Sequence, residues 1–309
     1  MTVTGPAIGL DLGGTKIAAA LVAPDGTVLA RHTRATPAAG GPDAVLDALA
    51  AAARAVDGGT GPGVLGVAAA GVIDPVTGTV TSATDSIRGW AGTALAVGLA
   101  ARTGLPVACD NDVRATAAPE LAAAGAGASL VYAAIGTGVG GAVAVGGRMV
   151  HGTAGIAGHL GHVPSPEAAG LPCTCGGTGH LEAVASGPGI AAVYGRLTGL
   201  PVDRLETVAE RAASGEEPAV RAIVTGAVAA GRVLGGLANT LGPDRVVVGG
   251  GVPHIGPLYW DALTEAFAAE LMPPLARLRP SRPLFGADAA VIGAARLPTQ
   301  VPLHAPPRS

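Results

Sequence analysis

The two halves of the chain show the same succession of short apolar runs, and this repetition constrains the fold more than any other feature. In the first half, three strand-like runs precede a helical pattern, a fourth strand, a second helix and a fifth strand. The second half repeats much of that order with different turns. Strands that alternate with helices predict a sheet covered by helices, with ligand-facing turns at the strand ends. We therefore predict an α/β protein of two βββαβα lobes separated by a central cleft.

The expected elements follow from apolar spacing and from the glycine and proline turns. In the first half they are strands at 7–12, 17–22, 28–35, 64–70 and 107–111 and helices at 43–56 and 93–103. In the second half they are strands from Leu130, Ala142 and Arg148, a helix at 219–241, a strand at 245–248 and a helix near 260–271. A length of 309 residues suits two domains. We place an N-terminal lobe at 1–117, joined by a C-terminal helix at 287–298, and a C-terminal lobe at 118–286.

Composition and charge exclude several classes of protein. Apolar residues make up 49% of the chain, which argues against intrinsic disorder. A formal net charge of -3 leaves no positive excess for nucleic acid or for an anionic membrane, so we expect neither as a partner. The first residues lack the basic and apolar regions of a secretory signal, which favours a cytoplasmic protein.

One uncharged stretch, 121–147, is long enough to span a bilayer. Its glycine content and its lack of helical periodicity argue against a transmembrane helix. We expect two buried strands there, with a tight turn at Gly146 and Gly147.

The first glycine-rich turn follows the first strand, within Asp11–Lys16. Adjacent glycines let backbone N–H groups approach an anion, of which phosphate is the obvious candidate. A plain strand-to-strand turn would use the same glycines. Lys16 is the single lysine of the chain, all other basic residues being arginine, and this favours phosphate contact.

Two further glycine runs lie at strand ends in the second half. The run 136–141 is followed by a strand, whereas a Rossmann dinucleotide site requires a helix there. We expect a second phosphate-binding hairpin instead. The run 249–251 suits either a nucleotide's base and ribose or a tight turn.

Asp112 stands where the strand 107–111 meets the next helix. An aspartate at such a position is a good helix cap. The same carboxylate could accept the proton of a substrate hydroxyl that attacks phosphorus. The sequence pattern leaves both roles open.

The densest group of metal-ligating side chains lies in a proline-rich loop at 158–182. It consists of His162, Cys173, Cys175 and His180. Two thiols and two imidazoles suit tetrahedral zinc, and four protein ligands would make the metal structural. Buried thiols with incidental histidines are the alternative. His159 and Glu182 flank the loop, either as ordinary loop residues or as ligands for the hydroxyls of a small polar substrate.

Together these residues resemble the ROK family of sugar kinases, which belongs to the actin-like ATPase superfamily with its ribonuclease H-like fold. The resemblance covers residues 7 to about 297. Its most specific part, 158–187, contains Gly-His-Leu-Gly-His, then Cys-Thr-Cys-Gly-Gly-Thr-Gly-His-Leu-Glu, then Ala-Ser-Gly. The resemblance implies an enzyme that uses ATP and Mg²⁺ to phosphorylate the 6-hydroxyl of a hexose, carries structural Zn²⁺, and forms dimers or tetramers.

The resemblance also implies a role for each matching residue. Asp112 would be the general base, Asp11 would lie near magnesium, and His162 would bind both sugar and zinc. The other sugar contacts would come from Gly71, Asn111, His159 and Glu182. The nucleotide would be held by Gly13, Gly14, Thr15, Lys16, Thr137, Gly138 and Gly140, and we add Gly249 and Gly250.

Three positions depart from the family pattern. His180 stands where many members have a third cysteine, and it replaces one good zinc ligand by another. The run 85–90 replaces a Pro-Asn-Leu sequence, which puts Ser86 where the family usually has a sugar-binding asparagine. His159 replaces a glutamate that binds sugar hydroxyls in the glucokinases, whereas bacterial N-acetylmannosamine kinases have Gly-His-x-Gly-His. The resemblance therefore favours N-acetylmannosamine as the substrate, with glucose as the alternative.

The family also contains sugar-responsive transcriptional regulators, which carry an additional N-terminal helix-turn-helix segment. Here the first expected strand begins near Ala7, and the charge balance does not favour DNA. We therefore expect an enzyme.

Overall fold

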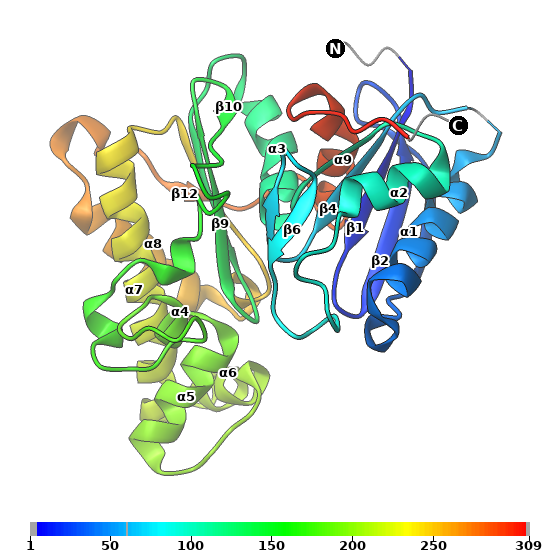
Figure 1. Ribbon diagram of the computed structural model, residues 1–309. Helices are drawn as coiled ribbons and strands as arrows, with labels where there is room; N and C mark the ends of the chain where they lie inside the picture. The colour runs from blue at the N-terminus through cyan, green and yellow to red at the C-terminus, as the bar shows by residue number, and fades with distance from the viewer. Residues whose placement is uncertain (1–4, 60, 307–309) are drawn as a thin grey trace. The chain divides into compact units, whose positions relative to one another are not determined.

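The computed structural model describes residues 5–59 and 61–306 (Figure 1). Its contacts divide the chain into two units. Unit 1 comprises the residues up to Ala123, the segment His151–Ile156 and the residues from Phe285 onward. Unit 2 comprises Ala124–Val150 and Ala157–Leu284. A boundary between 117 and 118 would divide the helix α3, Asp112–Ala124, which runs unbroken through that point.

Unit 1 contains a five-stranded sheet in the order β3-β2-β1-β4-β7. Strands β1, β2 and β3 form an antiparallel meander, whereas β4 and β7 run parallel to β1. The expected βββαβα order is confirmed. The strands are β1 (Ala7–Leu12), β2 (Lys16–Val22), β3 (Val28–Ala35), β4 (Leu65–Ala69) and β7 (Val107–Asn111), and the helices are α1 (Gly41–Asp57), α2 (Leu95–Thr103), α3 and α9 (Ala289–Arg296).

The helix α1 shows why these segments fold locally. Pro42 stands in its first turn, where a missing N–H is harmless. Its apolar side chains recur on one face and are buried, among them Val45, Leu49 and Val56. The helix ends at Gly58, whose φ of 57° is left-handed.

A short two-stranded hairpin was not expected from the sequence. Its strands are β5 (Val72–Asp74) and β6 (Thr79–Ser82), which are too short to show a period. The turn between them is fixed by Asp74, whose carboxylate accepts hydrogen bonds from the N–H of Val76 and the hydroxyl of Thr77, each at 2.9 Å. The Asp-Pro-Val-Thr-Gly sequence of 74–78 is a turn signal that could have revealed it.

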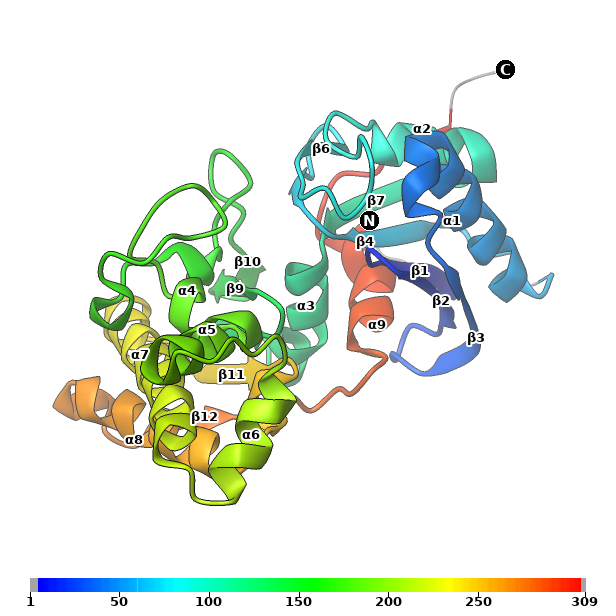
Figure 2. The ribbon, with the colours of Figure 1, turned by 90° about the horizontal axis from the view of Figure 1, so that it is seen from below.

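The C-terminal helix α9 packs directly on the sheet of unit 1 (Figure 2). A Cβ at Gly9 of β1 would lie 1.9 Å from the carbonyl oxygen of Val291, and a Cβ at Gly66 of β4 would lie 1.8 Å from that of Ala294. Both strand positions therefore require glycine, because the helix backbone occupies the place of a side chain. The helix α9 belongs to unit 1.

Replacement of Gly66 by alanine should lower the free energy of unfolding by about 1–3 kcal/mol, since the added methyl group must displace α9 from the sheet. Denaturant titration followed by circular dichroism would measure the loss. Gly63→Ala is the control, because a Cβ there meets open space. Equal midpoints for the two variants would contradict the packing argument.

Unit 2 repeats the topology of unit 1. Its sheet has the order β10-β9-β8-β11-β12, in which β8 and β9 are antiparallel and β11 runs parallel to β8. Its strands are β8 (Leu130–Ile135), β9 (Val139–Val145), β10 (Arg148–Met149), β11 (Arg245–Gly249) and β12 (Pro280–Ser281). Its helices are α4 (Glu182–Ala185), α5 (Gly187–Thr198), α6 (Leu205–Ala213), α7 (Glu217–Leu241) and α8 (Pro257–Glu270). The stretch 121–147 ends α3 and forms β8 and β9, which confirms the expectation of strands there.

The helix α7 is the one helix in the described part of the chain whose length and apolarity would suit a membrane span. Length and composition alone are weak evidence, and 56% of its apolar window is buried within the protein. Gly231 lets α7 approach α8 closely, since a Cβ there would lie 2.4 Å from the carbonyl oxygen of Leu263. Helix packing therefore accounts for the apolar face of α7.

Candidate active site

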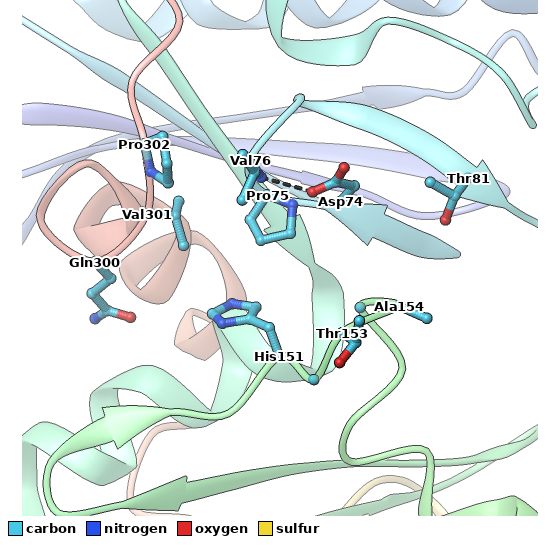
Figure 3. Close-up of a pocket in the computed structure, with 12 residues that line it drawn as sticks. Asp74, Pro75, Val76, Thr81, His151, Thr153, Ala154, Gln300, Val301 and Pro302 are labelled. Atoms are coloured by element: carbon cyan, nitrogen blue, oxygen red, sulfur yellow. Dashed lines mark hydrogen bonds between the residues drawn. The ribbon is translucent and has the colours of Figure 1, made fainter.

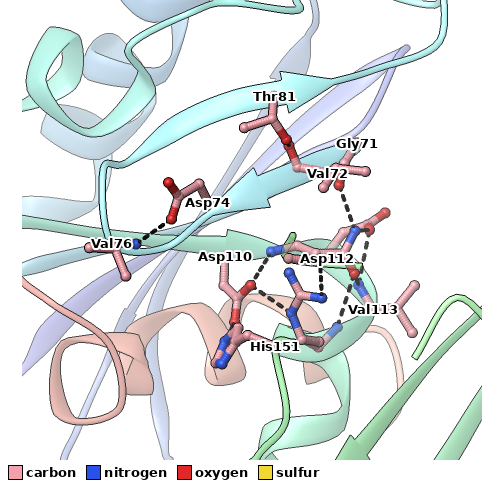
Figure 4. A network of polar contacts seen from close by, with 12 residues as sticks. Gly71, Val72, Asp74, Val76, Thr81, Asp110, Asp112, Val113 and His151 are labelled. Carbon is pink, nitrogen blue, oxygen red and sulfur yellow. Dashed lines mark hydrogen bonds and ion pairs between the residues drawn. The ribbon is translucent and has the colours of Figure 1, made fainter. Parts of the chain in front are cut away.

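The junction of β7 and α3 brings three of the expected substrate residues together (Figure 4). The Nδ2 of Asn111 donates to the carbonyl oxygen of Gly71 at 3.0 Å and to Oδ1 of Asp112 at 2.7 Å. The Oδ1 of Asn111 accepts from the N–H groups of Val113 at 3.0 Å and Arg114 at 3.3 Å. Asn111 therefore caps α3. The sequence left open whether Asp112 caps this helix, and in the structure Asn111 is the capping residue.

The carboxylate of Asp112 lies in an environment that suits a base. Its Oδ1 accepts from the N–H of Val113 at 2.9 Å as well as from Asn111. Burial raises the pKa of Asp112, and the Val113 hydrogen bond opposes this only in part. Burial also raises the pKa of Asp11 to about 6, with a further rise from the Asp112 charge and a reduction from Lys16. Two carboxyl groups with raised pKa values in one unit are a functional-site signal.

A buried ion pair between Asp110 and Arg114 connects the two sides of this junction. The Oδ1 of Asp110 accepts from the Nε of Arg114 and from the backbone N–H of Asn111, each at 2.7 Å. The side chains of Asp110 and Arg114 are 2% and 1% exposed. Breaking such a pair costs about 3–5 kcal/mol, because one charge is then buried alone. The pair therefore fixes the end of β7 to the first turn of α3.

The segment His151–Ile156 is anchored to the same pair. The Nε2 of His151 lies 2.7 Å from Oδ2 of Asp110, and the Nη1 of Arg114 donates to the carbonyl oxygen of Gly155 at 3.0 Å. Sequence reasoning missed Asp110, Arg114 and His151. A signal was available for Asp110 and Arg114, because an acidic and a basic residue four positions apart can form an ion pair.

A pocket of about 570 Å³ lies in unit 1 beside this network (Figure 3). His151 lines it, and the β5–β6 turn and Gln300 contribute further walls. The carboxylate of Asp74 faces Val76 within its own turn, which lowers its pKa. The carboxylate of Asp74 therefore stabilises the turn of the hairpin.

The first glycine turn closes on itself through a hydrogen bond from the N–H of Gly13 to the carbonyl oxygen of Lys16 at 3.0 Å. The hydroxyl of Thr36 donates to the carbonyl oxygen of Gly13 at 2.7 Å. Ser86 packs over the turn, since a Cβ at Gly14 would lie 3.2 Å from its Cβ. An anion would be bound by the later residues of the turn, Gly14 and Thr15, and by the exposed Lys16 that begins β2.

The second glycine turn is held by Glu182. Within the turn the N–H of Gly136 donates to the carbonyl oxygen of Gly138 at 2.9 Å. The N–H of Val139 donates to Oε2 of Glu182 at 2.9 Å. A Cβ at Gly138 would lie 2.8 Å from the same oxygen, so a side chain there would have to displace the carboxylate. Glu182 was expected to bind the sugar, and in this structure its carboxylate bonds to the hairpin.

A pocket of about 500 Å³ opens beside the second turn within unit 2. Thr137 lines it, together with Gly251 and three residues around the beginning of α6, namely Asp203, Arg204 and Glu206. These three residues were not singled out from the sequence, because nothing local distinguishes a helix start that faces a pocket from one that faces solvent. This pocket has the size of a small-molecule site.

Gly249 and Gly250 serve packing, while the neighbouring Gly251 lines the pocket. A Cβ at Gly250 would lie 2.2 Å from the carbonyl oxygen of Ile135, and its φ is 91°. A Cβ at Gly249 would lie 2.6 Å from the hydroxyl of Tyr132. Their glycine identity is therefore explained by the fold without a ligand.

The expected metal ligands gather in unit 2. One ligand atom from each of the four side chains lies within 4.8 Å of the others, in the cluster His162, Cys173, Cys175 and His180. The Sγ of Cys173 is 3.5 Å from Nδ1 of His162, and the Sγ of Cys175 is 3.2 Å from Nδ1 of His180. Ordinary zinc bond lengths in a tetrahedron separate sulfur and nitrogen by about 3.6 Å. The donor set and these two distances are compatible with zinc.

The remaining expected sugar residues also belong to unit 2. His159 precedes a short 3-10 helix, Leu160–His162, and its ring stacks on that of His162 with centroids 6.3 Å apart. Unit 2 therefore carries His159, His162 and Glu182, and unit 1 carries Gly71, Asn111 and Asp112.

Comparison with known proteins decides the family. A family model described as the ROK family matches residues 7–301. The chain belongs to the ROK family. Within this family it is 34% identical to an N-acetylmannosamine kinase of Escherichia coli O139:H28, over 79% of this chain and 82% of that protein.

Two solved ROK structures show the fold of this ROK chain. The ROK hexokinase from Thermus thermophilus is 33% identical with a TM-score of 0.84, covering 94% of this chain and 97% of that one. The ROK glucokinase from Streptomyces griseus, solved with glucose and AMPPNP, is 32% identical with a TM-score of 0.75, covering 95% and 99%. The expected family and the expected actin-like fold are both confirmed.

Proposed function

We propose that the chain is an ATP-dependent kinase that phosphorylates the 6-hydroxyl of a hexose, N-acetylmannosamine. The observation that carries the proposal is the carboxylate of Asp112, which burial holds at a raised pKa at the end of a strand of a ROK fold. His159, in a Gly-His-Leu-Gly-His run, favours the N-acetylated sugar over glucose. A relative that is an N-acetylmannosamine kinase supports the same choice.

The chemistry follows from the residues at the β7–α3 junction. Asn111 and the N–H of Val113 both bind Oδ1 of Asp112, which fixes the plane of the carboxylate and leaves Oδ2 for the substrate. Oδ2 accepts the proton of the sugar hydroxyl as the hydroxyl oxygen attacks the γ-phosphorus in line. Gly71, whose carbonyl oxygen accepts from Asn111, holds the amide in this orientation.

The two glycine turns are the proposed phosphate-binding elements for ATP. Lys16 and the N–H groups of the first turn bind phosphate oxygens, and Thr137 and the hairpin it begins bind others. When bound, Mg²⁺ neutralises the charge on the transferring phosphoryl group, and Asp11 is the residue proposed to hold it. The pocket lined by Thr137 and Gly251 receives the base and ribose, where Asp203 and Glu206 provide acceptors for ribose hydroxyls.

Zinc in the Cys₂His₂ cluster is proposed to be structural. Four protein ligands leave no open coordination position. The metal would fix the loop that carries His159 and His162, and so would order the sugar-binding residues of unit 2. We further propose that the enzyme acts in the cytoplasm as a homo-oligomer, a dimer or tetramer.

A coupled assay of ADP release with a panel of hexoses tests the substrate. We expect kcat/KM to be highest for N-acetylmannosamine among glucose, mannose, fructose, N-acetylglucosamine and N-acetylmannosamine. His159→Glu should shift the ratio of kcat/KM toward glucose by at least about tenfold, or 1.4 kcal/mol, because a carboxylate accepts from two hydroxyls while imidazole also donates.

His254→Glu provides the control for the change of charge, since His254 is an exposed histidine of the same unit. It should leave the preference unchanged. A parent enzyme that prefers glucose would refute the assigned sugar, and the absence of ADP release with every hexose would refute the kinase.

A further inference from the structure

The carboxylate of Glu182 joins two segments of unit 2 that are far apart in the sequence. Its Oε2 accepts the N–H of Val139 at 2.9 Å. Its Oε1 accepts the hydroxyl of Thr174 at 2.5 Å. Val139 begins β9 directly after the second glycine turn, and Thr174 stands between Cys173 and Cys175. One side chain therefore connects the glycine hairpin with the loop that carries the cysteines.

The connection acts at the glycine-rich turn that leads into β9. Four of the six residues in 136–141 are glycines, and glycine backbones have the widest conformational freedom. Besides the Glu182 contact, the N–H of Gly136 bonds to Gly138 and the N–H of Gly187 bonds to Gly136. Both of these bonds act at the first half of the turn. From Val139 onward the chain pairs with β8, Val139 lying opposite Ile135. The bond from Val139 to Glu182 adds a side-chain anchor at the point where the turn enters β9.

The orientation of Glu182 depends in turn on Thr174. A carboxylate with one hydrogen bond can rotate about its last torsion, which is broad for glutamate. A donor on each oxygen fixes both the rotation and the position of the group. The main chain around Thr174 is itself folded, because the N–H of Cys173 donates to Gly177 at 2.8 Å and that of Gly176 donates to Cys173 at 3.0 Å. These hydrogen bonds fix the main chain on both sides of Thr174, and so they fix the position from which its hydroxyl donates.

We propose that Thr174 is a positioning residue for nucleotide binding: through Glu182 it holds the second glycine hairpin in the conformation that binds phosphate. A well-ordered Cys-Thr-Cys loop thereby stabilises the ATP site as well as the sugar site. This inference rests on the proposed function in one respect, namely that the hairpin binds ATP phosphates. The link from Thr174 to the hairpin does not depend on it.

Thr174→Val removes the hydroxyl while keeping the shape of the side chain, and the residue is exposed, so folding should be unaffected. We expect zinc content equal to the parent, amide exchange at Val139 accelerated about fivefold or more, and a Kd for AMPPNP raised about three- to tenfold. Thr174→Ser restores a hydroxyl and should return both quantities to within about twofold of the parent. Metal analysis, hydrogen exchange with mass spectrometry and calorimetry provide these measurements.

Thr178→Val is the matched control, since Thr178 is an exposed threonine of the same loop. It should change neither exchange at Val139 nor AMPPNP affinity. Unaltered exchange and affinity in Thr174→Val would overturn the proposal, as would loss of zinc in that variant, which would place its effect in the metal loop. If the parent fails to bind AMPPNP, the proposed kinase fails, while exchange at Val139 still decides the link.

Discussion

Asp112→Asn should lower kcat for the hexose by about 10²- to 10⁴-fold, the range typical for loss of a general base. The asparagine can retain the hydrogen bonds from Asn111 and from the N–H of Val113 through its own Oδ1. The shape of the β7–α3 junction is thus preserved while proton acceptance is lost. Coupled ADP-release kinetics would measure kcat, and calorimetry would show that sugar and nucleotide still bind.

The control for this variant is Asp261→Asn, because Asp261 is an exposed aspartate on α8. It should retain full turnover. The parent should also lose activity on the acid side at a pH above that of an ordinary aspartate, since burial raises the pKa of Asp112 and only the deprotonated form accepts the proton. Turnover of Asp112→Asn within about tenfold of the parent would contradict the assignment of the base.

Simultaneous Cys173→Ser and Cys175→Ser replacements should abolish zinc binding and raise the KM for the hexose by at least about tenfold. The reason is that both thiols lie against imidazoles of the same cluster, and His162 belongs to the proposed sugar site as well. Elemental analysis of the purified protein should give about one zinc per chain for the parent and none for the double variant.

The third cysteine supplies the control. Cys109 is buried in β7 of unit 1, so Cys109→Ala removes a thiol without touching the cluster and should keep the zinc. A double serine variant that retains zinc at the parental ratio would show that the metal, if present, is held elsewhere.

The order of elements could be predicted because the signals are local. Buried strands such as β1 and β4 are mainly apolar, and glycines mark their ends. The cysteines and histidines of the metal cluster are close in sequence, so their grouping was also predictable. The contact of His151 with Asp110 joins residues 41 positions apart, and no local pattern distinguishes it from other contacts.

The glycines show a different limit of prediction. Gly138 and Gly250 occupy similar turns after strands, yet the first lies against a carboxylate and the second against the backbone of Ile135. A glycine indicates that something comes close to the chain, whereas the identity of the neighbour depends on tertiary structure. Thr174 could not have been identified for the same reason, because an exposed threonine in a loop has no sequence signature.

The glycine contacts of α9 have a consequence for biosynthesis. The strands β1 and β4 precede unit 2 in the sequence, but the helix that covers them follows it. Until Ala289–Arg296 has been translated, Gly9 and Gly66 lack the backbone of Val291 and Ala294 that later packs against them. The sheet of unit 1 can therefore receive its covering helix only after the segments of unit 2 have been synthesised. A nascent chain should need chaperone protection on its first-made half for longest.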